Sequence, residues 1–230
     1  MRAMKSKEMT DKLINVAKSL GADFIGIADS KGFLNPEYKG NKPQDIMENC
    51  KNIIIIGVSI PKGSFEPLPK GRAEYTNTLM AATATLRIIG FKLSKFIESI
   101  GYLATLAPSE GSEFGYWYAD KETLKADFSM KYACYLSGIG KFGLNQLIIT
   151  DKFGPKIRMA GIITDAPLLA DFPSKDFVDG RCKKCYKCID ICPVLALSKD
   201  GTINRQKCRD YMFNELGGLR CGLCIKVCPL

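Results

Sequence analysis

Histidine is absent from the 230 residues of this chain, and tryptophan occurs only once. Without histidine, the commonest metal ligand and the usual proton carrier near neutral pH are both missing. Any zinc site would therefore consist of cysteines or carboxylates. Any proton donor would be a tyrosine, a lysine, a cysteine or a carboxylic acid with a shifted pKa.

Long hydrophobic runs are also missing. The longest, "IIIIGVSI" at residues 53–60, is far shorter than the ~18 residues of a membrane-spanning helix and suits a buried strand. The opening "MRAMKSKEMTDK" lacks the apolar segment of a signal peptide. Because 46% of the residues are hydrophobic and 25% charged, we expect a globular, cytoplasmic protein that makes no membrane contact.

Hydrophobic periodicity divides the chain into two parts. It predicts helices over 10–20, 74–99 and 128–136, and strands over 22–28, 52–60 and 102–107. Two further apolar segments, 144–150 and 156–164, are joined by "DKFGP" and predict a β-hairpin. The alternation of helices and strands indicates an α/β domain over residues 1–170. A polar, proline-containing stretch separates it from a small cysteine domain, residues 171–230, so the expected fold class is α+β.

Eight of the ten cysteines lie in the last fifty residues, and two runs there end in Cys-Pro. They are Cys182, Cys185, Cys188, Cys192, Cys208, Cys221, Cys224 and Cys228. The first four follow C-x2-C-x2-C-x3-C-P, the pattern of bacterial ferredoxins, in which the fourth cysteine binds the other of two 4Fe–4S clusters. Nothing suggests secretion, which argues against disulfides, and a zinc site would need only four ligands.

The second run lacks its first cysteine, because Gly218 holds that position. Cys208 must then serve from ten residues upstream. This gives a first cysteine group, Cys182, Cys185, Cys188 and Cys228, and a second cysteine group, Cys192, Cys208, Cys221 and Cys224. Each group predicts one 4Fe–4S cluster. Cys50 and Cys134 fall outside both groups, in apolar surroundings, and are expected to be small buried hydrophobes.

The net charge of +9 raises the question of a nucleic-acid partner. Two clusters would lower the surplus to about +5. The basic residues are also spread along the chain without a long run of lysine and arginine. A solvated basic surface is therefore the preferred interpretation, with weak affinity for polyanions left open.

Two features resemble epoxyqueuosine reductases and reductive dehalogenases. One is the displaced Cys208. The other is "YLSGIGKFGLNQLIITDKFGPKIRMAGIITDAPL", residues 135–168, which is similar to that family's glycine turn, strand and exit segment. The resemblance covers residues 135–230, and residues 52–110 more loosely. It implies a nitroreductase-like α/β sandwich followed by a ferredoxin-like domain with two clusters.

The same resemblance implies a cobalamin that receives electrons from the clusters. The corrin-facing candidates that it carries over are Ser137, Gly138, Gly140, Arg158, Met159, Ala160 and Gly161. Candidate proton donors are Tyr75, Glu110, Glu113, Tyr116, Tyr118, Asp127 and Lys131, and no catalytic residue is assigned among them. An FMN in place of the corrinoid is the alternative cofactor, although no glycine motif that follows a strand supports it.

Two departures from the family pattern bear on the substrate. An epoxyqueuosine reductase carboxylate is expected about fourteen residues before the glycine turn, where this chain has Leu124, with Asp127 nearby. The chain also stops at Leu230, without the C-terminal extension that helps many of those enzymes hold tRNA, so we do not expect tRNA as a partner. Dehalogenases for their part commonly carry an export signal, which is missing here.

These observations predict an oxidoreductase of anaerobic metabolism. Electrons from an external ferredoxin or flavodoxin would pass through both clusters to the corrinoid and then to a small organic substrate. The alternative is an electron carrier or corrinoid activator that reduces a partner protein's cofactor. The 170-residue first domain speaks against a simple carrier, which would need only the last fifty residues.

Overall fold

The computed structural model describes residues 5–109, 112–113, 116–117, 119–173 and 175–230. These residues form two compact units. Unit 1 comprises residues 1–58, 83–139 and 159–173, and unit 2 comprises residues 59–82, 140–158 and 174–230. One division falls at residue 173, near the boundary expected at residue 170. Unit 2 also takes in two earlier segments, residues 59–82 and 140–158.

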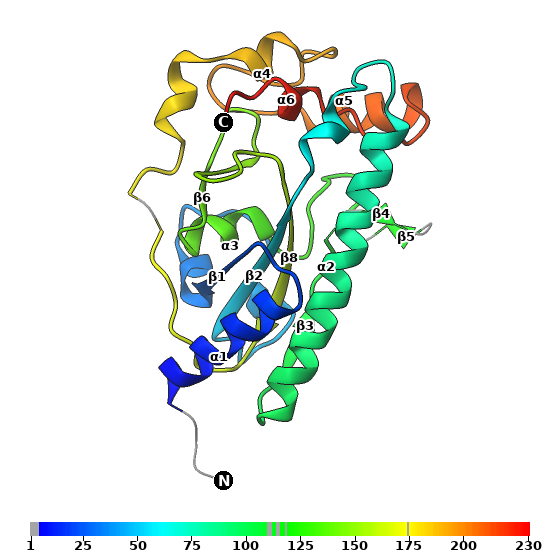
Figure 1. The fold of residues 1–230 in the computed structure, drawn as a ribbon. Coiled ribbons are helices and arrows are strands. Elements are labelled where there is room, and N and C mark those ends of the chain that lie inside the picture. The colour runs from blue at the N-terminus through cyan, green and yellow to red at the C-terminus, as the bar shows by residue number, and fades with distance from the viewer. Residues whose placement is uncertain (1–4, 110–111, 114–115, 118, 174) are drawn as a thin grey trace. The chain divides into compact units, whose positions relative to one another are not determined.

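A four-stranded sheet forms the centre of unit 1, in the order β1-β2-β8-β3 (Figure 1). Its strands are β1 (Phe24–Asp29), β2 (Asn52–Ser59), β3 (Ala104–Leu106) and β8 (Ile157–Thr164). β1 pairs antiparallel with β2, and β3 pairs antiparallel with β8. Lys51 N donates to Thr164 O over 2.9 Å, and Ile60 N donates to Lys156 O over 2.8 Å. β2 and β8 therefore also run antiparallel, because the start of β2 lies beside the end of β8 and the end of β2 lies beside the start of β8.

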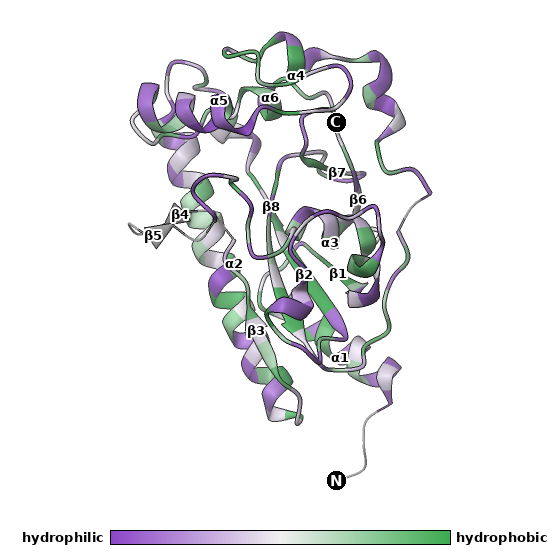
Figure 2. Ribbon diagram, turned by 180° about the vertical axis from the view of Figure 1, so that it is seen from behind, coloured by the Kyte–Doolittle hydropathy of each residue, from purple (hydrophilic) through white to green (hydrophobic). Residues whose placement is uncertain are grey.

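Strand β2 is the most deeply buried element of the sheet. The strand expected over 52–60 is confirmed, and its isoleucines Ile53–Ile56 are each 0% exposed. Figure 2 shows the hydrophobic colouring of this strand. Since successive side chains of a strand point to opposite faces, burial of four in succession means that both faces of β2 are covered.

We expect Ile54→Ala to lower the free energy of unfolding by about 2–5 kcal/mol, because it opens a cavity in a site with no access to solvent. Denaturant unfolding followed by circular dichroism measures the change. The matched control is Ile88→Ala on α2, where the side chain is 58% exposed and the change should stay within about 0.5 kcal/mol. Equal losses in the two variants would contradict the burial of β2.

The long helices follow the periodicity of the sequence. α1 (Ser6–Ser19) buries Met9, Leu13 and Ala17, which are spaced by four residues. α2 (Ala73–Ser99) has 27 residues, and hydrophobic and hydrophilic colours alternate along it in Figure 2. α3 (Met130–Leu136) begins after Ser129, whose Oγ accepts a hydrogen bond from Tyr132 N over 3.2 Å. Among the described residues, no helix combines the length and apolarity that crossing a bilayer requires.

The β-hairpin expected from 144–150 and 156–164 is wrong. β7 (Ile148–Thr150) pairs with β6 (Gly140–Phe142) in a small sheet of unit 2, and β8 belongs to the larger sheet. The connection "DKFG" does form a tight turn, closed by hydrogen bonds between Thr150 and Gly154. The pairing does not continue beyond this turn, because β8 pairs with β2 and β3 in the larger sheet. Another two-stranded pair joins β4 (Ser112–Glu113) and β5 (Tyr116–Trp117).

The cysteine segment of unit 2 consists of short helical pieces. They are a 3-10 helix (Gly180–Lys184), α4 (Lys187–Asp190), α5 (Arg205–Asp210), a π-helical turn (Tyr211–Glu215) and α6 (Leu223–Lys226). α6 packs into a hydrophobic cluster that joins Leu223 to Ile60, Phe65, Leu68, Tyr75 and Leu79. The cysteine segment therefore shares its core with residues from 59–82.

Candidate metal centre

The two cysteine runs adopt the same local backbone. Tyr186 follows Cys185 with φ 52°, and Gly222 follows Cys221 with φ 69°. Each of these left-handed residues starts a four-residue helix, α4 or α6, that carries the next cysteine. A left-handed residue turns the chain sharply, which brings the flanking cysteines to one side of the loop. Glycine adopts this conformation without strain, whereas tyrosine does so at a cost of about 1–2 kcal/mol.

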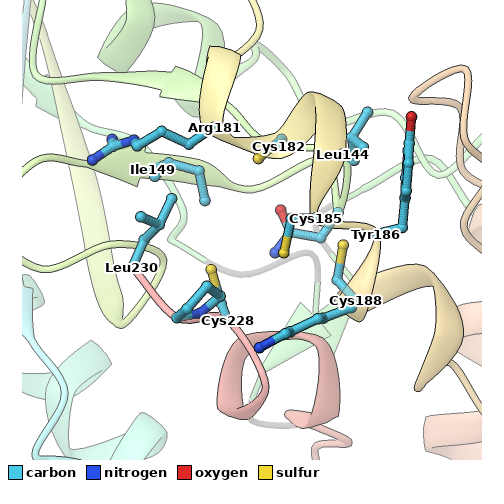
Figure 3. A pocket seen from close by; sticks show the side chains of 12 residues that line it. Leu144, Ile149, Arg181, Cys182, Cys185, Tyr186, Cys188, Cys228 and Leu230 are labelled. Carbon is cyan, nitrogen blue, oxygen red and sulfur yellow. The ribbon is translucent and has the colours of Figure 1, made fainter.

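The first cysteine group surrounds a cavity of about 170 Å³ in unit 2. Cys182, Cys185, Cys188 and Cys228 all line it. In Figure 3 their sulfur atoms point toward the space between the first cysteine run and the end of the chain. The remaining walls are largely apolar and include Leu144, Ile149 and Leu230. A site of this kind provides four thiol ligands and little competing water.

Burial and mutual proximity both act on these thiols. Burial, together with the neighbouring Cys182, Cys228 and Cys185, raises the pKa of Cys188 to about 11. Burial also raises the pKa of Cys182, while a hydrogen bond with the Leu144 backbone opposes the rise. The thiols of Cys182 and Cys188 are thus influenced by other members of the first cysteine group, which places them within electrostatic reach of those sulfurs.

The second cysteine group is gathered around Cys224. Burial raises the pKa of Cys224 to about 12, and Cys221, Cys208, Cys188 and Cys192 contribute in the same direction. Three of these four are the other members of the second cysteine group. Ala196 N donates a hydrogen bond to Cys192 Sγ over 3.3 Å. Cys208 is thus brought to Cys221 and Cys224 in the folded chain, as the spacing argument requires.

Cationic side chains from distant parts of the sequence hold both loops. Arg72 Nη1 donates to the carbonyl oxygen of Cys221 over 2.6 Å, and Arg72 is 9% exposed. Lys156 Nζ donates to the carbonyl oxygens of Cys228 over 3.0 Å and Leu230 over 2.7 Å. Sequence reasoning missed both residues. No local signal marks them, because each acts on a partner at least 72 positions away.

An ion pair fixes the entrance to the first cysteine run. Arg181 Nη2 contacts Asp179 Oδ2 at 2.6 Å and Asp151 Oδ1 at 3.1 Å. The hydrogen bonds from Arg181 lower the pKa of the Asp179 carboxyl. Asp179 Oδ1 also accepts from Arg181 N over 2.9 Å, so the carboxylate caps the 3-10 helix that contains Cys182.

Tyr75, a candidate proton donor, lies beside the second cysteine group. It is 1% exposed, and burial raises the pKa of its phenol above the ordinary value, with Cys224 as the next cause. A Cβ added to Gly222 would lie 2.4 Å from Tyr75 Cε1, so the ring packs directly on the second run. Burial lowers the pKa of Arg158 to about 10, and the nearby Arg220 acts in the same sense.

The structure gives the glycines among the corrin-facing candidates ordinary packing partners. In unit 1, the Cβ position of Gly138 is occupied by Phe172 O at 2.6 Å, and that of Gly161 by Phe128 Cζ at 3.0 Å. In unit 2, the Cβ position of Gly140 is occupied by Ile149 O at 2.6 Å. These contacts account for the lack of a side chain at each position, and the corrin-facing role of the glycines stays a prediction.

The other corrin-facing candidates divide between the units. Ser137 in unit 1 is buried, and its Oγ donates to Cys134 O over 2.9 Å. Met159 and Ala160 belong to the part of β8 that lies in unit 1, while Arg158 belongs to unit 2. The structure therefore does not bring the seven candidates together within one unit.

The structure does not support a proton-donor role for the remaining candidates. The side chains of Glu110, Glu113, Tyr116 and Tyr118 lie outside the described residues. Asp127 is exposed, next to the buried Phe128. An aromatic group that sequence reasoning missed lies in unit 1, where Phe33 packs edge-on against Tyr38 and Tyr132.

We expect Cys50 and Cys134 to resist thiol reagents in the folded protein with both clusters bound. Both are buried, and burial raises the pKa of Cys50 to about 11 and that of Cys134 further. At pH 8 both thiols then stay protonated, and the thiol is not the nucleophilic form. Labelling with Ellman's reagent measures this: the folded protein should react at neither site, and unfolding should expose both. Rapid labelling of Cys134 in the folded state would contradict its burial.

A 4Fe–4S cluster needs four cysteine thiolates arranged around a space larger than a single ion. The cavity walled by the first cysteine group meets that requirement, and the sulfurs face it. Within the described residues, no three or more Cys, Asp or Glu side chains converge as ligands of a single metal ion. The residues present therefore fit a cluster at the first cysteine group.

Comparison with known proteins agrees with this geometry. Residues 181–230 match the 4Fe-4S dicluster domain. An epoxyqueuosine reductase of Bacillus anthracis is 27% identical over 268 residues, covering 98% of this chain and 65% of that protein. A tetrachloroethene reductive dehalogenase of Dehalobacter restrictus is 35% identical over 112 residues, covering 49% of this chain and 17% of that protein. This chain is a homologue of both groups of reductases.

Solved structures show the same fold. A catabolic reductive dehalogenase covers 99% of this chain with a TM-score of 0.79 at 18% identity, and this chain covers 32% of it. An epoxyqueuosine reductase in complex with an epoxyqueuosine-modified tRNA stem loop covers 96% of this chain with a TM-score of 0.66 at 23% identity, and this chain covers 64% of it. The chain thus spans slightly less than two thirds of the length of its epoxyqueuosine reductase homologues.

The homology relates this chain to both groups of reductases, and the domain match gives a mixed α/β chain a ferredoxin-like C-terminal region. The expectation that tRNA is not a partner gains no support, since one relative of the same fold was solved with a tRNA stem loop. Another relative of the same fold is a reductive dehalogenase whose structure suggests a mechanism for B12-dependent dehalogenation.

Proposed function

We propose that this protein is a cobalamin-dependent reductase that receives single electrons at two 4Fe–4S clusters and reduces a small organic substrate. The observation that carries the iron–sulfur part is the cavity walled by Cys182, Cys185, Cys188 and Cys228. The second cysteine group around Cys224 accounts for the other four ligands. When bound, each cluster would supply one-electron transfer.

The chain's own residues have definable tasks in this proposal. The apolar cavity walls exclude water from the first cluster, and Arg72 and Lys156 fix the loop carbonyls of Cys221 and Cys228. The buried Tyr75 closes the second cysteine group on the side of α2. These are positioning roles, because each residue contacts a ligand-bearing loop.

The proposal of cobalamin rests on homology and not on an observed binding pocket for the corrin. Both groups of relatives share the fold, and one of the solved dehalogenases is associated with B12-dependent dehalogenation. The nitroreductase-like sandwich, the small substrate and the corrin-facing role of Arg158 belong to the same proposal. The protein would contribute orientation and electrostatics, and the cofactor would contribute the reactive centre.

Anaerobic reconstitution with iron, sulfide and hydroxocobalamin tests the proposal. Iron at about eight atoms per chain, together with EPR signals from reduced clusters and a cobalt(II) signal that survives gel filtration, is the expected result. Clusters without retained corrinoid would favour the electron carrier or activator. Retained FMN would favour a flavin enzyme, and zinc in place of iron would overturn the iron–sulfur assignment.

A further inference from the structure

An exposed basic face borders the cavity of the first cysteine group, which Lys187 helps to line. It is formed by Lys183 and Lys184 in the 3-10 helix, Lys187 in α4, and Lys199, all of them exposed; we call these four the lysine face. Lys199 Nζ lies 5.2 Å from the centre of the Tyr186 ring, and the other three are within three residues of Tyr186 in sequence. The lysine face is therefore centred on Tyr186.

The charge of this surface is not neutralised locally. Residues 181–200 contain five basic residues and two acidic ones, Asp190 and Asp200, which leaves a net charge of +3 before any cluster is counted. Arg181 pairs with Asp179 and Asp151. Lys183, Lys184 and Lys187 form no ion pair with any described carboxylate. Asp200 is engaged by Thr202, whose Oγ1 donates to it over 2.7 Å.

Exposed hydrophobic side chains lie beside the lysines. Leu195 is 74% exposed and Ile191 is 42% exposed, and both belong to the segment that follows α4. Leu195 and Ile191 place apolar surface beside the lysines, and protein interfaces combine an apolar centre with a charged rim. A nucleic-acid surface would use the lysines but not Leu195 and Ile191.

The lysine face borders the cavity of the first cysteine group. Tyr186 and Lys187 line the same cavity as Cys182, Cys185 and Cys188, and these cysteines are only half-buried. The second cysteine run packs against Tyr75, which is 1% exposed. A partner bound at the lysine face would therefore approach the first cysteine group before the second.

We propose that the lysine face, with Leu195 and Ile191, is the docking surface for a small acidic electron-transfer protein that donates electrons to the first cysteine group's cluster. This rests on the proposed function. The donor is oxidised by one electron and the bound cluster is reduced by one, and no bond is made or broken. Lysines at the rim attract an acidic partner over distance, while the apolar residues hold it once docked.

Binding of oxidised flavodoxin to the reconstituted protein, measured by isothermal titration calorimetry at low and high salt, is the primary test. We expect the Kd to rise by about tenfold between 20 mM and 300 mM salt, because the Debye length falls from about 20 Å to about 6 Å. The double variant Lys183→Gln/Lys184→Gln should weaken binding at low salt by about tenfold and flatten the salt dependence. Leu195→Asn should weaken binding at every salt concentration and leave its salt dependence unchanged. Asparagine is chosen because it tolerates the φ of 49° at this position.

The matched control is Lys7→Gln/Lys18→Gln. It removes the same charge from two exposed lysines of α1 in unit 1, and it should leave the Kd and its salt dependence as in the wild type. In stopped-flow experiments, reduced flavodoxin should reduce the clusters more slowly in the variants that bind it more weakly. The small methyl viologen radical should reduce the clusters of all variants at the same rate.

The outcomes separate this proposal from the proposed function. Absence of cluster spectra after reconstitution would overturn the proposed function itself. Intact clusters with equal flavodoxin affinity in wild type and Lys183→Gln/Lys184→Gln would overturn the docking surface alone. Weaker binding of a tRNA stem loop by that variant, with unchanged binding of flavodoxin, would also overturn it and assign the lysine face to nucleic acid.

Discussion

Cys208→Ala is expected to reduce the iron content from about eight to about four atoms per chain, because a 4Fe–4S cluster requires four cysteine ligands. Cys208 lies outside both short runs, yet it acts on the thiol of Cys224 together with Cys221 and Cys192. The variant should therefore lose the second cluster and keep the first. Iron and sulfide analysis after anaerobic reconstitution measures the loss, and EPR identifies the remaining cluster.

Cys50→Ala is the control for this experiment. Cys50 is buried in unit 1, where its Sγ lies 3.6 Å from Asn52 O, and it belongs to neither cysteine group. Its replacement should leave about eight irons per chain. If Cys208→Ala also retained eight, the division of the cysteines into two groups of four would be wrong.

The second large effect is expected at Gly222. An alanine there would adopt φ 69°, which costs about 1–2 kcal/mol for a residue with a Cβ. Its Cβ would also lie 2.4 Å from Tyr75 Cε1 and 2.8 Å from Leu68 Cδ1, and relieving that overlap would cost about 1–3 kcal/mol. Thermal unfolding followed through the visible circular dichroism of the clusters should show a lower Tm and earlier loss of the second cluster.

Gly217→Ala separates the two costs. Gly217 has φ 60° and no heavy atom within 4 Å of its Cβ position, so this variant carries the backbone strain without the overlap. Its loss of stability should be about half that of Gly222→Ala. Equal losses in both variants would show that Tyr75 does not pack against the second cysteine run.

Local patterns in the sequence were sufficient for elements whose partners lie nearby. The strand 52–60 followed from an unbroken apolar run, and α2 followed from its periodicity. The division of the cysteines also followed from spacing, and the structure places the members of each group near one another. Two clusters at these eight cysteines nevertheless stay a prediction until metal is measured.

Contacts between residues far apart in the sequence could not be predicted from local patterns. The hairpin was wrong because a turn fixes only where the chain reverses, whereas β8 pairs through Ile163 with Thr105, more than fifty residues away. Arg72 could not be linked to Cys221 either, because 149 positions separate them. The corrin-facing role of the glycines stays a prediction, because their close contacts with Phe172, Ile149 and Phe128 account for small residues there with or without a cofactor.

The shared core of unit 2 has a practical consequence for anyone who wishes to excise the ferredoxin-like segment. Leu223 and Ile225 pack against Phe65, Leu68 and Tyr75, and Lys226 Nζ donates to the carbonyl oxygens of Glu66 and Leu68. A peptide of residues 181–230 would leave that apolar surface bare and would lose the guanidinium that holds Cys221. The ferredoxin-like segment therefore does not have a complete core of its own. Transferring it to another scaffold would require residues 59–82 as well.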